Sequence, residues 1–215
     1  MNLHVHDWGD PDAPAVVCLH GVTHDGAQFA GLAERLTGFR VLAPDLRGHG
    51  RSGWEPPWDL ATLLDDVLET VDVASASWVG HSLGGRLVLE LLAREPECVD
   101  RAVLLDPAIR LRPDIALELA DEALRRTADG YSQAAHVSIL GALAAWAPAP
   151  EGIGVPLLLL LADHESVVGP GQLERYERAL GGLIQVARVR GGHEVLDDAL
   201  DDTVAAVTAF LGPPA

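Results

Sequence analysis

Short apolar segments alternate with longer segments of helical periodicity along this chain. The apolar segments predict seven β-strands, at residues 3–8, 15–20, 39–45, 76–81, 101–106, 155–162 and 183–190. The runs AVVCLH (15–20) and VPLLLLLA (155–162) lack a strict alternation of apolar and polar residues. Such runs are typical of strands that are covered on both faces.

Helical periodicity begins near Ala27, Asp59, Leu83, Asp114, Gly171 and Leu196. The segment after Asp59 shows it most clearly, because its leucine and valine residues recur at spacings of three and four. Strands that alternate with helices predict an α/β fold with a mostly parallel central sheet and helices on both faces.

One stretch departs from this alternation. Residues 107–154 have mostly helical patterns and lie where a single crossover helix would suffice. An insertion at the end of a strand is typical of a segment that covers a functional site. We therefore expect one domain over residues 1–215, with a helical cap at about 107–154.

Composition narrows the range of partners. The chain has 215 residues and a formal net charge of -17, and all 15 of its basic residues are arginine. Strong acidity argues against nucleic acid or an anionic membrane as a partner. The N-terminus shows no signal-peptide pattern and no apolar run is long enough to cross a bilayer, which favours a cytoplasmic location.

Metal-binding signals are weak. The two cysteines, Cys18 and Cys98, lack the spacing of metal ligands. The histidines do not form a pair at helical spacing with a neighbouring carboxylate. We expect no metal and no cofactor.

The sequence GHSLG at residues 80–84 is the strongest chemical signal. It lies between a predicted strand and a predicted helix, the setting in which G-x-S-x-G forms a nucleophile elbow. Small residues at Gly80 and Gly84 allow a sharp turn that lifts the Ser82 hydroxyl to the N-terminus of the helix. A serine before a helix often serves only as its N-cap, so the elbow needs further support.

Two other segments supply it. His20 and Gly21 follow a strand, so the backbone N–H of Val22 can point to the same place as that of Leu83 and form an oxyanion hole. His193 lies in a glycine-rich loop after the last strand. It can act as the base that a serine nucleophile requires.

Five segments in order resemble the α/β-hydrolase family: the His20-Gly21 pair, PDLRGHGRS (44–52), GHSLGG (80–85), LLDPA (104–108) and GGHEVL (191–196). The resemblance covers nearly the whole chain. It implies a catalytic triad in the order nucleophile, acid, histidine.

Three carboxylates are candidates for the acid of that triad. Aligning LADHESVV (161–168) with the family pattern puts Glu165 in the position of the acid. Asp163 in the same loop is an alternative. Asp106, at the end of an earlier strand, is another, because some relatives place the acid there.

The predicted function is hydrolysis of esters with small to medium acyl groups through an acyl-serine intermediate. His20, Gly21 and Trp146 are candidate substrate contacts. Alternatives on the same fold are carbon-carbon bond hydrolysis, a lyase similar to that of the menaquinone pathway with Arg86 binding a carboxylate, and a small-ligand sensor that keeps the triad. The sequence does not fix the oligomeric state.

Overall fold

The computed structural model describes residues 1–125 and 132–214. All seven predicted strands are present. They are β1 (Val5–Trp8), β2 (Ala15–Leu19), β3 (Arg40–Pro44), β4 (Ala76–His81), β5 (Val99–Leu105), β6 (Leu157–Ala162) and β7 (Ile184–Val189).

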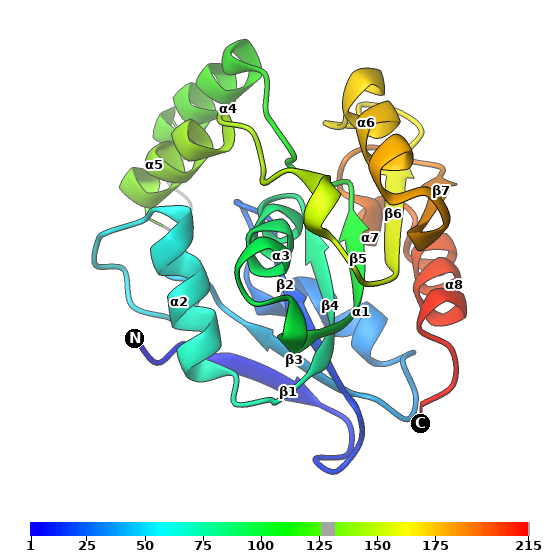
Figure 1. Cartoon of the computed structure of the whole chain (residues 1–215). Coiled ribbons are helices and arrows are strands. Elements are labelled where there is room, and N and C mark those ends of the chain that lie inside the picture. The colour runs from blue at the N-terminus through cyan, green and yellow to red at the C-terminus, as the bar shows by residue number, and fades with distance from the viewer. Residues whose placement is uncertain (126–131, 215) are drawn as a thin grey trace.

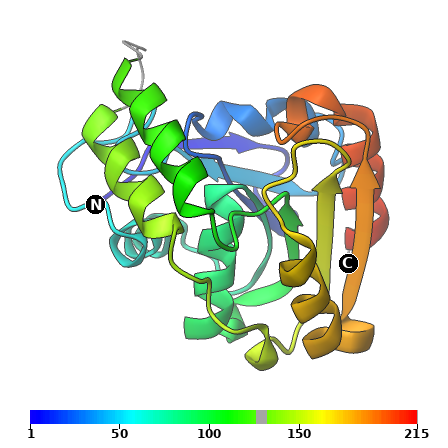
Figure 2. The same ribbon diagram turned by 90° about the horizontal axis from the view of Figure 1, so that it is seen from above.

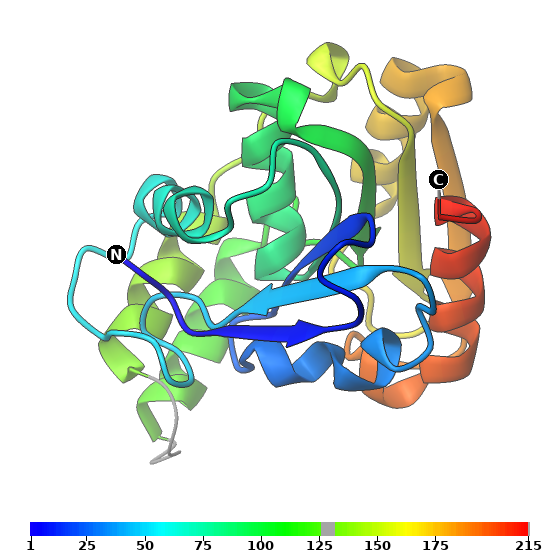
Figure 3. The same cartoon turned by 90° about the horizontal axis from the view of Figure 1, so that it is seen from below.

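The strands form one sheet in the order β1-β3-β2-β4-β5-β6-β7. Every neighbouring pair is parallel except β1 and β3, which are antiparallel at one edge (Figure 3). β4 and β5 lie side by side in the middle, so the residues that follow them meet at the same edge of the sheet.

Side chains of the central strands alternate between two cores. Val16 and Cys18 of β2 belong to one core, and Val17 and Leu19 belong to the other. The second core includes residues of α2 (Leu60–Thr70), α3 (Leu83–Arg94) and α6 (Pro170–Leu180). The first includes residues of α1 (Ala30–Ala33), α7 (Val195–Asp198) and α8 (Leu200–Leu211), so the predicted covering of both faces is confirmed (Figure 1).

Local features of the sequence and backbone set the start of α2 and the boundary between α7 and α8. α2 begins where Asp59 accepts a hydrogen bond from the Thr62 N–H at 2.9 Å, which is a side-chain N-cap. The helix expected near Leu196 is divided into α7 and α8, because Ala199 has φ -142° and ψ 43°, outside the helical region.

The segment predicted as a cap contains α4 (Pro113–Arg125) and α5 (Gln133–Leu143), which pack against one another beyond the sheet edge (Figure 2). Residues 126–131 of the predicted cap lie outside the described residues. Backbone hydrogen bonds join this segment to the rest of the fold, from Ala108 N–H to the Ser82 carbonyl and from Ser132 N–H to the Gly48 carbonyl.

No helix in the described part of the chain combines the length and the apolar character that crossing a membrane requires.

Candidate active site

Ser82 lies in a sharp turn between β4 and α3. Its φ is 52° and its ψ is -108°, a strained backbone conformation for a residue with a side chain. The turn depends on two glycines. A Cβ on Gly84 would lie 1.8 Å from the Leu19 carbonyl oxygen, and one on Gly80 would lie 2.3 Å from that of Gly84. This geometry is that of a nucleophile elbow.

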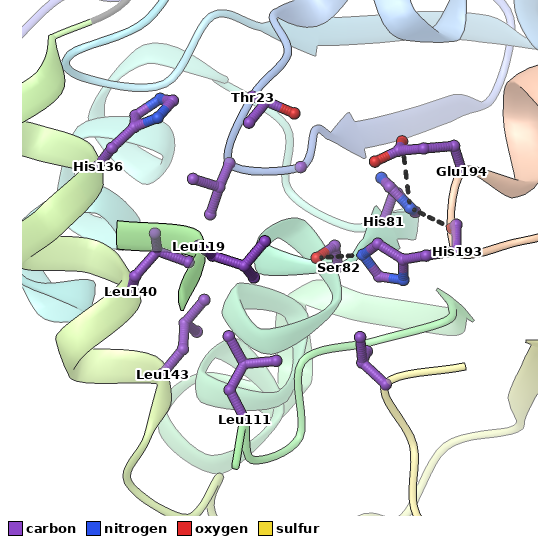
Figure 4. A pocket seen from close by; sticks show the side chains of 13 residues that line it. Thr23, His81, Ser82, Leu111, Leu119, His136, Leu140, Leu143, His193 and Glu194 are labelled. Atoms are coloured by element: carbon purple, nitrogen blue, oxygen red, sulfur yellow. Dashed lines mark hydrogen bonds and ion pairs between the residues drawn. The ribbon is translucent and has the colours of Figure 1, made fainter. Parts of the chain in front are cut away.

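The Ser82 hydroxyl does not cap α3, although Ser82 occupies the N-cap position. Its Oγ lies 2.9 Å from His193 Nε2 (Figure 4). His193 follows β7 in the loop that leads to α7, so the last strand brings the imidazole to the elbow.

The other ring nitrogen of His193 faces Asp106. His193 Nδ1 and Asp106 Oδ2 are 2.6 Å apart, and Asp106 is fully buried directly after β5. The carboxylate can only accept, so Nδ1 carries the proton and Nε2 is left to accept from Ser82. Ser166 Oγ and the Val167 N–H also donate to Asp106.

The expectation that Glu165 contacts His193 is corrected by this arrangement. Glu165 is exposed and has a left-handed φ of 55°. The turn at Glu165 directs the next residues, Ser166 and Val167, toward Asp106 instead. Asp163 is also engaged elsewhere, because it accepts from the Gly191 N–H at 2.9 Å.

The candidate oxyanion donors are the N–H groups of Val22 and Leu83. Their neighbours are engaged: Gly21 N–H donates to Gln28 Oε1 at 3.2 Å, and Gly84 N–H donates to the His20 carbonyl at 3.1 Å. In residues 1–125 and 132–214, neither the Val22 nor the Leu83 N–H makes a hydrogen bond. Both donors are therefore free to bind a ligand oxygen.

A cavity of about 210 Å³ opens beside Ser82. Figure 4 shows Leu119, Leu140 and Leu143 on the side of the cap, and His81 and Glu194 on the opposite side of Ser82. The full lining is Gly21, Val22, Thr23, His81, Ser82, Leu111, Leu119, His136, Leu140, Leu143, Val167, His193 and Glu194.

Two of the three candidate substrate contacts lie outside this lining. Gly21 lines the cavity, but the His20 ring is turned into the protein, where Nε2 accepts from the Leu46 N–H at 2.9 Å. Burial keeps the pKa of His20 well below its usual value. Trp146 is 48% exposed, and its ring packs against the guanidinium groups of Arg110 and Arg175.

Arg86 does not face the cavity either. It is 3% exposed and donates to the carbonyls of Ala145 and Trp146 and to the Glu90 carboxylate. These bonds hold the segment that follows α5. The position of Arg86 therefore does not support a role in binding a substrate carboxylate.

Glu194 is a member of the site that the sequence reasoning missed. Its carboxylate accepts from His24 Nε2 at 2.9 Å. Partial burial opposes ionisation, but the hydrogen bond from His24 and the nearby His81 lower the pKa of Glu194 to about 2. A carboxylate next to the histidine of a motif such as GGHE is the signal that could have identified it.

Some of these side chains also come within metal-binding distance. His81, His193 and Glu194 place ligand atoms within 4.8 Å of one another. However, His193 already uses Nδ1 for Asp106 and Nε2 for Ser82, so a metal would have to replace one of these contacts. The hydrogen-bonded arrangement suits acid-base chemistry better than metal binding.

Comparison with known proteins agrees with this geometry. Residues 14–135 match the model of the alpha/beta hydrolase fold family, and the chain belongs to that family. It is 39% identical to the lipase LipV of Mycobacterium tuberculosis over 68% of this chain and 57% of LipV. It is 31% identical to the carboxylesterase YbfK of Bacillus subtilis over 60% of this chain and 46% of YbfK. The chain thus spans about half the length of these curated relatives.

Among solved structures, the enol-lactonase of Burkholderia xenovorans superposes with a TM-score of 0.85 at 27% identity. The superposition covers 97% of this chain and 96% of the lactonase. The predicted fold class and the resemblance to the α/β-hydrolase family are confirmed by these comparisons.

Proposed function

We propose that this protein hydrolyses neutral carboxylic esters with small to medium acyl groups, using Ser82, His193 and Asp106 as its triad. The observation that carries the proposal is the continuous hydrogen-bonded line from Ser82 through His193 to buried Asp106, at the side of an apolar cavity. The lipase and carboxylesterase relatives support ester cleavage in particular.

The reaction begins when His193 Nε2 takes the proton of the Ser82 hydroxyl and Oγ attacks the ester carbonyl carbon. The N–H groups of Val22 and Leu83 bind the oxyanion that forms. His193 then gives its proton to the departing alcohol, which leaves an acyl-serine. A water molecule, deprotonated by the same nitrogen, attacks the acyl carbon. His193 then returns the proton to Ser82 Oγ as the acid leaves, which restores the free hydroxyl and the neutral ring.

Asp106 stabilises the imidazolium that forms in both steps and fixes the ring tautomer. Its burial makes this effect strong, because a charge is screened less in the protein interior than in water. The N–H of Val167 and the hydroxyl of Ser166 hold the carboxylate in place.

The lining of the cavity supports a neutral substrate. Its wall on the cap side is made mainly of leucine side chains, with His136 of α5 as the polar member, and the leucines suit an aliphatic acyl chain. Arginine is absent from the lining given by the described residues, and Glu194 brings a negative charge. The net charge of -17 also repels anionic substrates.

The experiment is a kcat/KM series over p-nitrophenyl esters of increasing acyl length, with the p-nitrophenyl ester of succinic acid as an anionic comparison. We expect turnover of the neutral esters, a maximum at small to medium length, and at least about tenfold lower kcat/KM for the anionic ester of similar size.

Turnover confined to a single burst would support the sensor alternative. An equal or higher kcat/KM for the anionic ester would contradict the proposed substrate class.

A further inference from the structure

Gln28 links the oxyanion loop to the nucleophile elbow. It lies in the short 3₁₀ helix Gly26–Phe29 that follows β2. Its Oε1 accepts from the Gly21 N–H at 3.2 Å, and its Nε2 lies 3.1 Å from His81 Nδ1. Gly21 precedes the oxyanion donor Val22, and His81 precedes Ser82.

His81 extends this link to the loop that carries the proposed base. Its Nε2 lies 2.9 Å from the backbone carbonyl oxygen of His193. One neutral ring therefore joins the residue before the nucleophile to the backbone of the residue that would deprotonate it.

Donor and acceptor can be assigned for each hydrogen bond that connects Gly21, Gln28, His81 and His193. The His193 carbonyl can only accept, so His81 Nε2 carries a proton. His81 is 1% exposed, and burial, together with nearby His193, lowers its pKa to about 4, so the ring is neutral near pH 7. Its Nδ1 must then accept from the Gln28 amide nitrogen, which leaves Gln28 Oε1 to accept from Gly21.

The packing around the link is tight. A Cβ on Gly21 would lie 2.8 Å from His81 Nδ1, so the oxyanion loop passes directly over the ring. Gln28 Nε2 also donates to Glu194 Oε2 at 3.5 Å, which it can do with its second hydrogen. Small movements of Gln28 would therefore shift both the oxyanion loop and the His193 loop.

We propose that Gln28 and His81 are positioning residues, which hold the Val22 N–H and the His193 ring in register with Ser82. The proposal rests on the proposed function, since the parts it aligns are the proposed oxyanion donor, nucleophile and base. Neither residue reacts with the substrate. Their contribution is a fixed geometry that favours the transition state over the bound ester.

The chain offers a matched control in Gln172 of α6. Its Oε1 accepts from the Gly169 N–H at 3.0 Å, and its Nε2 donates to the Arg110 carbonyl at 3.0 Å. Gln172 thus makes the same kinds of bond as Gln28, but it does not line the cavity. Gln172→Met removes one accepted and one donated bond, and Gln28→Met removes one accepted bond and the donated bonds to His81 and Glu194; both substitutions keep the side-chain length.

The experiment measures kcat and KM on an activated neutral ester, and the affinity for a trifluoromethyl ketone that forms an adduct with an active-site serine. For Gln28→Met we expect kcat to fall about 10- to 100-fold with KM within about threefold, because misplacing a catalytic group by 1 Å can cost that much. Ketone affinity should fall by a similar factor. Gln172→Met should keep both values within about twofold of wild type, even if it lowers Tm equally.

Equal kcat values for the two variants would overturn the proposal, and so would a loss in Gln28→Met that appears only in KM. If Gln28→Met does not fold, Gln28→Glu keeps the acceptor for Gly21 and removes the donor to His81, and an unchanged kcat there would also overturn it. A wild-type protein without ester turnover would instead refute the proposed function.

Discussion

Two acidic residues, Asp106 and Glu165, follow neighbouring strands and share a left-handed backbone conformation, but they differ in burial and in their contacts. Asp106 follows β5 with φ 41°, and Glu165 lies in the loop after β6 with φ 55°. Asp106 is fully buried and faces His193, whereas Glu165 is exposed. A left-handed turn and a carboxylate therefore do not identify a triad acid. The contact with the histidine does, because a carboxylate can orient His193 only from hydrogen-bond distance, and Asp106 Oδ2 lies 2.6 Å from His193 Nδ1.

The largest effect is expected from replacing Ser82 or His193, because the mechanism needs both residues whichever carboxylate is the acid. Ser82→Ala and His193→Ala should each lower kcat/KM on an activated ester by about 10⁴-fold or more, because each removes the same nucleophile-base unit. Circular dichroism and Tm should stay close to wild type. Residual turnover near the wild-type value in purified protein would refute the serine-histidine mechanism for either acid.

Asp106→Asn comes next. The side chain keeps its shape but loses the charge that stabilises the His193 imidazolium, so kcat should fall on the order of 10³- to 10⁴-fold. The ring would also lose its fixed tautomer. Steady-state kinetics measure this, with Glu165→Gln as the matched control. A fall below about tenfold would mean that another carboxylate serves His193.

Ser166→Ala tests how Asp106 is held. Ser166 Oγ donates to Asp106 Oδ1, but Oδ2 faces His193 and also accepts from the Val167 N–H. Because one supporting bond is lost while the contact with His193 stays, we expect kcat to fall about three- to tenfold. A loss as large as that of Asp106→Asn would show that the serine acts directly.

Replacements of Glu165 should have the smallest effect. Glu165→Gln and Glu165→Gly should both keep kcat/KM within about twofold of wild type. Glycine accepts a left-handed φ without strain, so the Tm of Glu165→Gly should be no lower than that of wild type. A tenfold loss of activity in either variant would restore Glu165 as a candidate acid.

The strands and the turn at Ser82 could be predicted from the sequence alone. The seven apolar runs predicted all seven strands, and the local signal was strongest in β2 and β6, which are buried on both faces. The nucleophile elbow could also be predicted from the sequence, because glycine is the only residue type that fits at positions 80 and 84. The motif GHSLG is contiguous and could be recognised in the sequence, although the contact of Gly84 with the Leu19 carbonyl is made with a distant strand, β2.

The carboxylate that contacts His193 could not be predicted from local sequence. Which carboxylate meets His193 depends on contacts between three loops that are far apart in the sequence, those that follow β5, β6 and β7. Arg86 shows the same limit. Its partners Ala145 and Trp146 lie about sixty residues further along the chain, so its burial left no local trace in the helix that carries it.

The most direct test of the proposed mechanism is the rate at which a fluorophosphonate labels Ser82, followed by mass spectrometry. The reagent reacts with a serine that has been activated by its base, so the rate reports on the whole line from Ser82 to the acid. We predict a single adduct on Ser82, equal rates in wild type and Glu165→Gln, and labelling slower by at least about 100-fold in Asp106→Asn. An adduct on another residue, or slow labelling in Glu165→Gln with a normal rate in Asp106→Asn, would contradict the account.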